Sequence, residues 1–292
     1  MSRPLAALAV VVLCSTALVG CRVIQDQPPG LCTEFGLANG DPRAHAELDP
    51  TSPDVRLDAS HRGGGDRGRY HLFTQGIDWE RPVGLLVRLH GDGAEEFTVP
   101  EGLLSCLAAE AASHNMVLLA PLTPDPSRGR TWWSDLDANL AWLESLVDSQ
   151  AEELGIDPEL VWWMGYSGGA EMISYGVLAQ EPRLVTGGAL LVAGGGAPRR
   201  TPTTAPASLR QGTCLQWVVG AGDDGSDPIE DFDALSAARA GSASYAEAGY
   251  EKVGLRVVPG EDHLSLPQSG LLDQVLGQGC PLGGGAADLA GR

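Results

Sequence analysis

One serine of this 292-residue chain stands in a setting that favours nucleophilic chemistry. Ser167 is the centre of the pentapeptide GYSGG, residues 165–169, which matches the pattern G-x-S-x-G. A strand-like run precedes it and a helix-like segment follows, so the serine would sit on a tight strand-to-helix turn. Glycines fit such a turn because a Cβ atom would collide with neighbouring backbone. The pattern predicts a hydroxyl at a helix start, where N–H groups favour developing negative charge. A glycine-rich turn without catalysis is the alternative.

A serine hydroxyl is a poor nucleophile at neutral pH, so it needs a base, and the base needs an orienting carboxylate. Of six histidines only His263 follows Ser167, and it lies just after the last predicted strand. The segment Gly220-Ala221-Gly222-Asp223-Asp224 offers two acids after the preceding strand, with Asp227 a distant third. These three aspartates could instead bind calcium, although they lack the EF-hand spacing.

The negative charge formed during acyl transfer needs two N–H donors. Gly168, directly after the serine, would supply one of them. The other would come from the loop His90-Gly91-Asp92-Gly93, through the backbone N–H of Asp92 or Gly93. His90 precedes the nucleophile, so we expect it to hold this loop by hydrogen bonds and not to act as the base.

With these motifs in this order, the chain from about residue 70 to residue 276 resembles the α/β-hydrolase superfamily. More narrowly, IDPELV at residues 156–161 running into GYSGG is similar to a segment of secreted esterases related to polyhydroxybutyrate depolymerases and feruloyl or acetylxylan esterases. The spacing Gly-x-x-Asp after a strand, seen in many hydrolases of this fold, favours Asp223 over Asp224. The resemblance implies ester hydrolysis through an acyl-enzyme, with no metal or organic cofactor. The chain departs from the family pattern in two respects. Asp92 lies inside the loop 90–93 that would supply the second N–H donor, and no substrate-binding module is obvious.

The elements that would position these residues alternate between apolar strands and amphipathic helices. Near-continuous apolar strands indicate a sheet covered on both faces, and helix-length connections indicate a mostly parallel sheet. We expect a three-layer α/β-hydrolase fold with little or no lid. The expected strands are 70–74, 83–89, 116–120, 160–164, 188–192, 215–220 and 255–258, and the expected helices are 102–114, 136–154, 169–180 and 271–276.

The first twenty residues predict an export signal. Arg3 precedes an uninterrupted run of apolar or small residues, 5–19, whose helical length of about 22 Å is shorter than a hydrocarbon core of about 30 Å. The run ends in Leu18-Val19-Gly20-Cys21, which is typical of a bacterial lipobox. We therefore expect residues 1–20 to be a lipoprotein signal peptide and a lipid on Cys21 to anchor the protein outside the cytoplasm. An ordinary cleaved signal or an uncleaved anchor is the alternative.

The other cysteines fit an oxidising compartment. Cys14 leaves with the signal, and the remaining four permit three pairings. The expected topology places Cys214 at the start of a strand and returns the last helix towards Cys280 on the same edge. This favours a Cys214–Cys280 bridge and leaves Cys32 with Cys106 to fasten the N-terminal segment to the first helix. No C-x-x-C spacing is present, so a zinc site is not expected.

The charge and composition exclude several classes of protein. The chain carries 38 acidic and 19 basic side chains, a formal charge of −19, which becomes −20 once the leader and its Arg3 are removed. Such a balance argues against nucleic acid and polyanionic substrates and suits neutral esters. It also leaves attachment to an anionic membrane to the lipid anchor. A hydrophobic content of 43 % excludes a disordered acidic chain.

We expect three regions in the full chain: the signal peptide, a tether over residues 21–66 with at most one short strand around Val55, and a catalytic domain over 67–292 with a loose tail. Trp132, Trp133 and Tyr166 are candidate substrate contacts at the catalytic edge, although tryptophans in such a loop are at least as often structural. Residues 197–212 are short, polar and proline-rich, which predicts an open site for a polymer end or a bulky ester. A peptidase or acyltransferase is the nearest alternative, and a non-catalytic binding protein on a hydrolase scaffold is another.

Overall fold

The computed structural model describes residues 29–125, 127, 129–199, 205–227, 231–278 and 280, and its centre is an eight-stranded sheet of order β1-β2-β4-β3-β5-β6-β7-β8. The strands are β1 (Val55–Gly63), β2 (Asp66–Phe73), β3 (Gly84–Leu89), β4 (Met116–Leu122), β5 (Val161–Tyr166), β6 (Gly188–Val192), β7 (Cys214–Gly220) and β8 (Lys252–Val258). The helices are α1 (Glu95–Thr98), α2 (Leu103–Ser113), α3 (Leu136–Leu154), α4 (Gly168–Met172), α5 (Leu178–Gln180), α6 (Ala207–Gly212), α7 (Ala234–Glu247) and α8 (Gln268–Gln278). Residues 1–28, with the expected signal and Cys21, lie outside the described residues.

Six strands of the sheet, β3 to β8, run parallel, and β1 and β2 extend one side in antiparallel fashion. Every residue of β3, β4, β6 and β7 is buried, as the apolar runs predict for a sheet covered on both faces. Because parallel strands end at the same edge, the loops after β3, β4, β5, β7 and β8 gather there. These loops carry the candidate residues.

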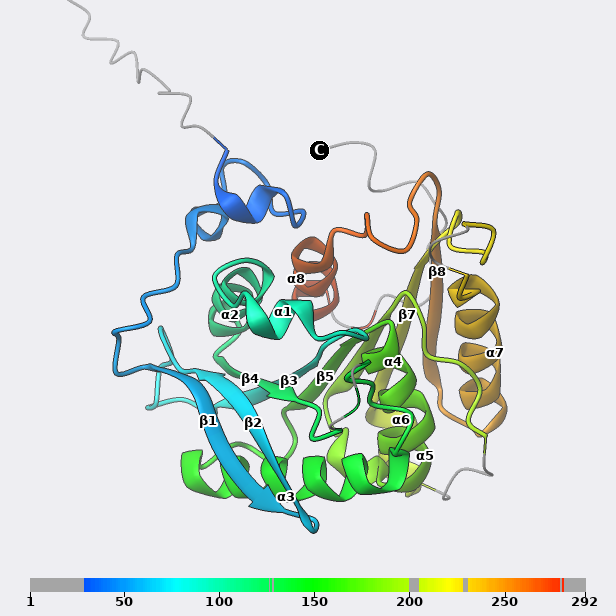
Figure 1. Cartoon of the computed structure of the whole chain (residues 1–292), viewed down its shortest axis with the longest axis horizontal. Coiled ribbons are helices and arrows are strands. Elements are labelled where there is room, and N and C mark those ends of the chain that lie inside the picture. Colours follow the sequence, from blue (N-terminus) through cyan, green and yellow to red (C-terminus); the bar gives the residue numbers. More distant parts are fainter. Residues whose placement is uncertain are drawn as a thin grey trace, which may run out of the picture.

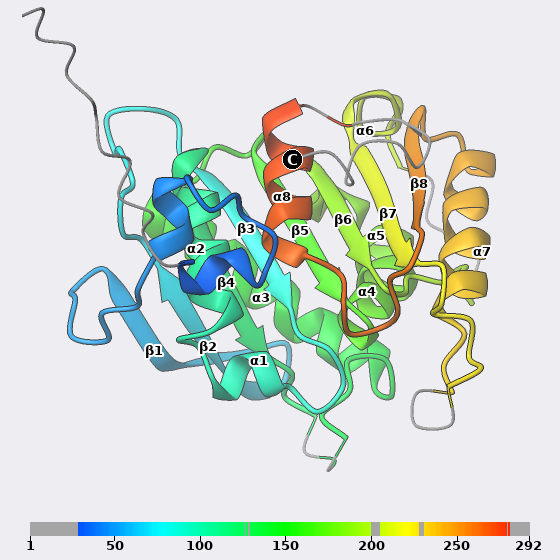
Figure 2. The same cartoon turned by 90° about the horizontal axis from the view of Figure 1, so that it is seen from above.

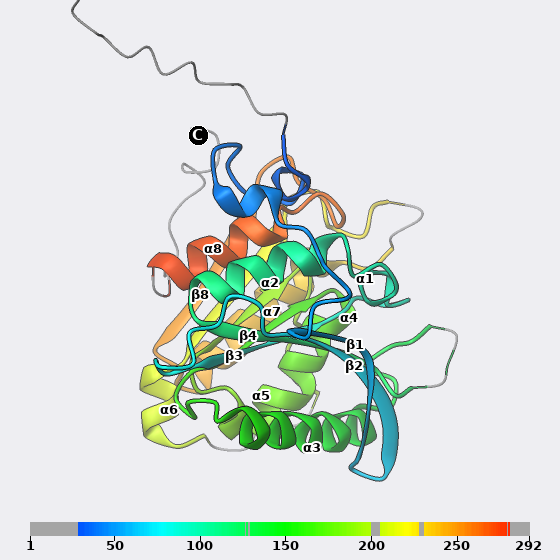
Figure 3. The same cartoon turned by 90° about the vertical axis from the view of Figure 1, so that its left-hand side faces the viewer.

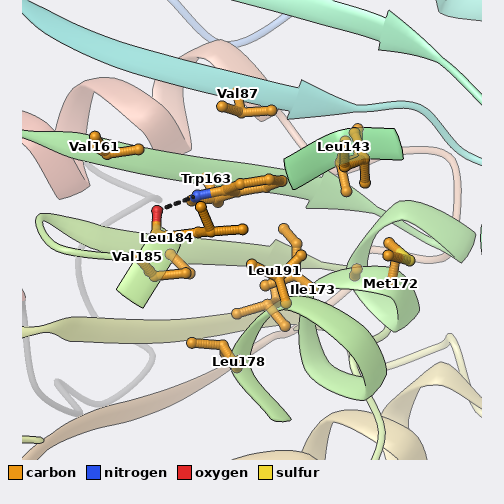
Figure 4. Packing of buried hydrophobic residues seen from close by; sticks show 14 of the residues in the cluster. Val87, Leu143, Val161, Trp163, Met172, Ile173, Leu178, Leu184, Val185 and Leu191 are labelled. Carbon is orange, nitrogen blue, oxygen red and sulfur yellow. Dashed lines mark hydrogen bonds between the residues drawn. The ribbon is translucent and has the colours of Figure 1, made fainter. Parts of the chain in front are cut away.

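Helices cover both faces of the sheet (Figures 1 and 3). Helices α2 and α8 pack on one face, and α3, α4, α5 and α7 pack on the other. Trp163 of β5 is fully buried in the second layer, and its indole N–H donates a 2.7 Å hydrogen bond to the carbonyl of Leu184 (Figure 4). The single polar atom of this large side chain is therefore satisfied, so the strand that leads to Ser167 is held in a dense apolar layer.

The N-terminal segment differs from the expected tether. Its described part forms two 3₁₀ turns, Leu31–Thr33 and Pro42–His45, and contributes β1, a nine-residue strand that pairs with β2. The turns lie beside α2 and α8 (Figure 2). Arg43 binds Glu110 of α2 at 2.5 Å and Asp273 of α8 at 3.0 Å. Residues 29–66 are thus packed on the domain, because burial and ion pairs hold a segment whose composition is typical of a loop.

Both expected disulfides are confirmed. Cys32 is bonded to Cys106 of α2, and Cys214 at the start of β7 is bonded to Cys280, which follows α8. Disulfides persist in oxidising compartments, so the protein is expected to work outside the cytoplasm. None of the helices in the described part of the chain has the length and apolarity needed to cross a bilayer.

Helix α7 was not among the expected elements. It joins β7 to β8 and is built from small residues, which give little amphipathic contrast. They allow a close approach, since a Cβ atom on Gly241 would lie 1.9 Å from the carbonyl oxygen of Gly195. Asp233 caps the helix by accepting a 2.8 Å hydrogen bond from the backbone N–H of Ser236. The connection between two parallel strands, which needs a crossover, was the available signal for this helix.

Candidate active site

Ser167 occupies a strained turn between β5 and α4. Its φ of +50° and ψ of −119° lie in a region that residues other than glycine rarely adopt. Its N–H donates a 2.9 Å hydrogen bond to the carbonyl of Val192, at the end of β6. A Cβ atom on Gly165 would lie 2.5 Å from the carbonyl carbon of Gly169, and one on Gly169 would lie 2.5 Å from the carbonyl oxygen of Leu89. The structure confirms that this turn needs glycine at both positions.

Three side chains from three loops meet at this turn. His263, in the loop after β8, has its Nε2 atom 3.0 Å from the Ser167 hydroxyl oxygen. Its Nδ1 atom lies 2.9 Å and 3.0 Å from the two carboxylate oxygens of Asp223, in the loop after β7. A carboxylate only accepts, so Nδ1–H donates to Asp223 and Nε2 is left to accept the hydroxyl proton of Ser167. Asp223 and His263 are both buried, being 4 % and 7 % exposed.

The geometry distinguishes the two adjacent aspartates. Asp224 is exposed, and its carboxylate accepts a 3.1 Å hydrogen bond from the backbone N–H of Ser226. Hydrogen bonds of this kind, from the backbone and hydroxyl of Ser226, lower the pKa of Asp224. Asp223 therefore faces His263 and Asp224 faces solvent, so the aspartates do not converge as calcium ligands.

Backbone and side-chain contacts fix the position of His263. The hydroxyl of Tyr166 donates a 3.0 Å hydrogen bond to the carbonyl of His263. The carboxylate of Asp262 accepts 3.0 Å hydrogen bonds from the N–H groups of Leu264 and Ser265. The loop after β7 is bound to the histidine loop as well, because the Gly222 N–H donates a 2.9 Å hydrogen bond to the carbonyl of Glu261. Tyr166, a candidate substrate contact from the sequence, thus supports the histidine loop through its hydroxyl.

Two backbone N–H groups beside Ser167 are available to a ligand. Among the described residues, neither the Gly168 N–H nor the Asp92 N–H has a hydrogen-bond acceptor. The Gly93 N–H donates to the carbonyl of Gly129 at 2.7 Å. Of the two alternatives in the loop, Asp92 is therefore the available second donor.

His90 holds the loop after β3. Its Nδ1–H donates a 2.6 Å hydrogen bond to the carbonyl of Gly91, and its Nε2 accepts a 3.1 Å bond from the N–H of Thr123. Burial lowers the pKa of His90 to about 4, so the ring is neutral at pH 7. The two ring nitrogens thus join the loop after β3 to the first residue after β4, which matches the supporting role expected for this histidine.

The fold has counterparts among solved structures. A carboxylesterase from Mesorhizobium loti is 22 % identical with a TM-score of 0.59, and the match covers 77 % of this chain and 99 % of that one. A Bacillus cereus carboxylesterase is 20 % identical with a TM-score of 0.53, covering 72 % and 94 %. A feruloyl esterase module from Clostridium thermocellum is 11 % identical with a TM-score of 0.51, covering 79 % and 90 %. The chain has the α/β-hydrolase fold. No family model and no curated protein matches the sequence.

In this α/β-hydrolase fold the side chain of Asp92 takes an unexpected place. Its carboxylate accepts a 3.1 Å hydrogen bond from the indole N–H of Trp133. A Cβ atom on Gly168 would lie 2.0 Å from Oδ1 of Asp92 and 3.4 Å from Cδ1 of Trp133, so the carboxylate lies against the Gly168 backbone. Burial raises the pKa of Asp92, and the hydrogen bond from Trp133 opposes this rise. The sequence indicated Asp92 as a candidate backbone donor and as a departure from the family pattern, but it did not predict this side-chain contact.

Trp132 is not a substrate contact, which corrects that expectation. Its side chain is fully buried, and its ring lies 4.9 Å from the ring of His90. Trp133 is 37 % exposed and remains accessible to a ligand. The side chains of adjacent loop residues point in different directions. The sequence of this loop contains no pattern that predicts which of the two indoles is buried.

Glu171 of α4 is a supporting residue that sequence reasoning missed. It is buried, and its Oε1 accepts hydrogen bonds of 3.0 Å and 3.2 Å from the N–H groups of Gly195 and Gly196, after β6. Burial raises the pKa of Glu171, and the bonds from Tyr175 and this loop oppose that rise. The carboxylate fixes the loop beside Ser167. The only feature of the sequence that indicated this role was the position of Glu171, an acidic residue among apolar ones, four residues after Ser167.

Exposed apolar side chains border the site. Three exposed hydrophobic side chains come from separate loops at this edge: Trp133, Phe232 and Leu264. The ring of Phe232 lies 6.2 Å from that of His263, and Leu264 follows His263 directly.

Helix α6 belongs to the segment in which a lid could have been inserted. It lies beside the start of β8, because the carbonyl of Arg210 accepts a 2.8 Å hydrogen bond from the N–H of Glu251. It is therefore at the opposite edge, and residues 200–204 lie outside the described residues.

One group of side chains has the composition of a metal site. Among the described residues, Glu110, His114 and Asp273 could offer ligand atoms to one ion. The guanidinium of Arg43 already lies against the carboxylates of Glu110 and Asp273. We attribute this cluster to the attachment of the N-terminal segment, away from Ser167.

Proposed function

We propose that the protein is a serine-dependent carboxylic-ester hydrolase. The observation that carries the proposal is the linked contact of Ser167, His263 and Asp223, with two free N–H groups beside the serine. A neutral imidazole in contact with a serine hydroxyl makes the hydroxyl a competent nucleophile at neutral pH. The carboxylesterase and feruloyl esterase structures named above have this fold, and the chemistry of the site is consistent with their names.

The reaction would proceed in two halves. The Ser167 oxygen attacks the ester carbonyl carbon while its proton moves to Nε2 of His263, and the N–H groups of Gly168 and Asp92 bind the oxyanion. Collapse breaks the bond to the alcohol, which leaves with the proton from His263. Water then gives a proton to His263 and attacks the acyl-enzyme, and the acid is released as Ser167 regains its proton. Asp223 keeps the imidazole oriented and stabilises it when protonated.

The exposed apolar side chains at this edge favour esters with a bulky or polymeric portion. Phe232 and Leu264 border the side on which His263 would protonate the leaving alcohol. An acidic surface with a net charge of −19 disfavours polyanionic substrates. Polymer ends and phenolic or acetyl esters on large carriers fit this description.

Hydrolysis of p-nitrophenyl butanoate tests this function. Ser167→Ala should lower kcat by at least about 10⁴-fold while leaving the thermal melting temperature nearly unchanged. Ser226→Ala, an exposed serine of the same edge, is the matched control and should retain activity. Turnover by Ser167→Ala at the rate of the parent protein would refute the proposal. A parallel assay with the p-nitroanilide and with added alcohol acceptors separates ester hydrolysis from peptidase and acyltransferase activity.

We also propose that Cys21 carries the lipid that anchors this domain outside the cytoplasm. The apolar run that ends at Cys21 supports the proposal, and the two disulfides fit the compartment. When the full chain is expressed with Cys21→Ser, the protein should either leave the membrane fraction for the soluble fraction or keep its signal peptide uncleaved. Unchanged, detergent-dependent extraction of a processed Cys21→Ser protein would contradict it.

A further inference from the structure

The carboxylate of Asp92 has no cationic partner within the part of the chain that the structure describes. Its hydrogen bond comes from the neutral indole of Trp133, at 3.1 Å. The charged groups that act on it are Asp125, which repels it, and His263, which attracts it when protonated. Asp92 is therefore a negative charge at the mouth of the site that no arginine or lysine of the described residues balances.

This charge lies where the proposed reaction develops a negative charge. The carboxylate packs against the backbone of Gly168, and the N–H groups of Gly168 and Asp92 would hold the oxyanion. Two like charges a few ångströms apart in a partly hydrated site repel each other. With a neutral ester the carboxylate would thus oppose the step that the N–H groups assist. A positive charge on the substrate would remove this conflict.

The sheet order indicates which part of the substrate would carry that charge. Asp92 and Trp133 come from the loops after β3 and β4, on one side of β5, whereas His263 and Phe232 come from loops on the β7 and β8 side. The leaving alcohol must lie near His263, because it receives the proton from Nε2. With the alcohol on the His263 side, we infer that the acyl portion extends towards Asp92 and Trp133.

We propose that Asp92 and Trp133 form a subsite for a positively charged group, a quaternary ammonium or a protonated amine, on the acyl part of the substrate. An unpaired carboxylate next to an exposed indole is a combination that binds ammonium groups, through charge and through the ring face. The inference rests on the proposed ester hydrolysis and adds a substrate class to it. The net charge of the protein would assist by raising the local concentration of cations.

A pair of substrates of equal shape isolates the charge. One is p-nitrophenyl 4-(trimethylammonio)butanoate, and the other is p-nitrophenyl 5,5-dimethylhexanoate, in which carbon replaces the nitrogen. The measured quantity is the ratio of kcat/KM for the cationic and the neutral ester, in the parent protein and in Asp92→Asn. The two esters differ in intrinsic reactivity, but this difference is the same for both proteins. It therefore cancels when the ratio in Asp92→Asn is compared with the ratio in the parent protein. Asparagine keeps an oxygen that can accept from Trp133.

We expect Asp92→Asn to lower the ratio about ten- to hundredfold. KM for the cationic ester should rise, because a charge contact is lost, and kcat for the neutral ester should rise, because repulsion of the oxyanion is lost. Asp224→Asn removes a charge from the opposite side of the same edge and should change the ratio less than about twofold. Trp133→Leu should lower the ratio without changing the net charge.

A cation on the alcohol side provides the second control. The ratio for butanoylcholine and 3,3-dimethylbutyl butanoate should stay within about twofold in Asp92→Asn, since that cation would lie near His263. A larger effect on this pair than on the acyl pair would overturn the assignment to the acyl side. If Ser167-dependent hydrolysis is present but Asp92→Asn leaves the acyl ratio unchanged, the subsite is refuted while the esterase function stands. Absence of Ser167-dependent hydrolysis of every ester would instead refute the function itself.

Discussion

The Nδ1 atom of His263 lies 2.9 Å from the carboxylate of Asp223, and the neighbouring Asp224 turns away to bind the backbone of Ser226. Two aspartates that are adjacent in the sequence thus have different surroundings, one buried against an imidazole and the other exposed. They form a natural matched pair for testing which carboxylate orients the base.

Asp223→Asn should lower kcat for a nitrophenyl ester by about 10³–10⁴-fold, because an amide no longer fixes the imidazole tautomer or stabilises its protonated form. Asp224→Asn makes the same chemical change on an exposed side chain and should alter kcat less than about twofold. Steady-state kinetics of both variants, with circular dichroism to verify folding, measure the difference. Equal losses in the two variants would show that the contact with His263 has no special role.

The close packing of the serine turn makes a prediction about stability. Gly169→Ala would place a Cβ atom 2.5 Å from the carbonyl oxygen of Leu89, so either β3 or α4 must move. We expect a loss of about 3 kcal/mol or more in the free energy of unfolding, measured by urea denaturation. Gly212→Ala, at the end of α6, meets no atom within 4 Å and should change stability by less than about 1 kcal/mol. Similar losses for both variants would contradict the packing described here.

His90 predicts a pH dependence of stability. Its pKa is about 4 in the folded protein and 6.5 in an unfolded chain, so between these values the unfolded state binds more protons. The stabilisation is complete above pH 6.5 and is lost as the pH falls towards 4, by about 3 kcal/mol in total. Urea denaturation at several pH values should show this loss in the parent protein.

His90→Gln, which cannot titrate in this range, should show a flatter dependence of unfolding free energy on pH. His45→Gln replaces an exposed histidine and should keep the dependence of the parent protein. A His90→Gln profile parallel to that of the parent protein from pH 7 to pH 4 would rule out the account of His90.

The disulfides should each contribute substantially to stability. They join residues 74 and 66 positions apart, and loops of these lengths correspond to about 4 kcal/mol of stabilisation. The paired replacement Cys32→Ser with Cys106→Ser should lower the free energy of unfolding by about this amount, as should Cys214→Ser with Cys280→Ser. Urea denaturation measures both, and a loss below about 1 kcal/mol in either pair would contradict the prediction.

The sequence predicted the parts of the site that follow from chain order and strand ends. Ser167 and Asp223 follow the apolar strands β5 and β7, which are largely and wholly buried and are recognisable as apolar runs in the sequence. His263 was identified because no other histidine follows Ser167. Topology also predicted the disulfides, because the start of β7 and the end of α8 lie at the same edge. Both inferences depend on features that a parallel sheet imposes on any chain.

Other features were invisible because they depend on side-chain direction or on contacts between distant segments. Strand β1 lies at the edge of the sheet, and after the buried Val55 its residues alternate between partly buried and exposed, so its polar sequence resembles that of a tether. Helix α7 is built mostly from small residues, so its sequence shows only a weak helical periodicity of large apolar side chains. The burial of Trp132, the contact of Asp92 with Trp133 and the choice between Asp92 and Gly93 as donor each required three-dimensional coordinates.

Covalent labelling tests the central claim most directly, because only an activated serine reacts readily with a fluorophosphonate. The parent protein should gain one phosphonyl group, which peptide mapping by mass spectrometry should locate on Ser167. Ser167→Ala should remain unlabelled, and His263→Ala should react far more slowly, since His263 is the base. An unlabelled parent protein, or a label that persists in Ser167→Ala, would contradict the assignment of Ser167 as the nucleophile.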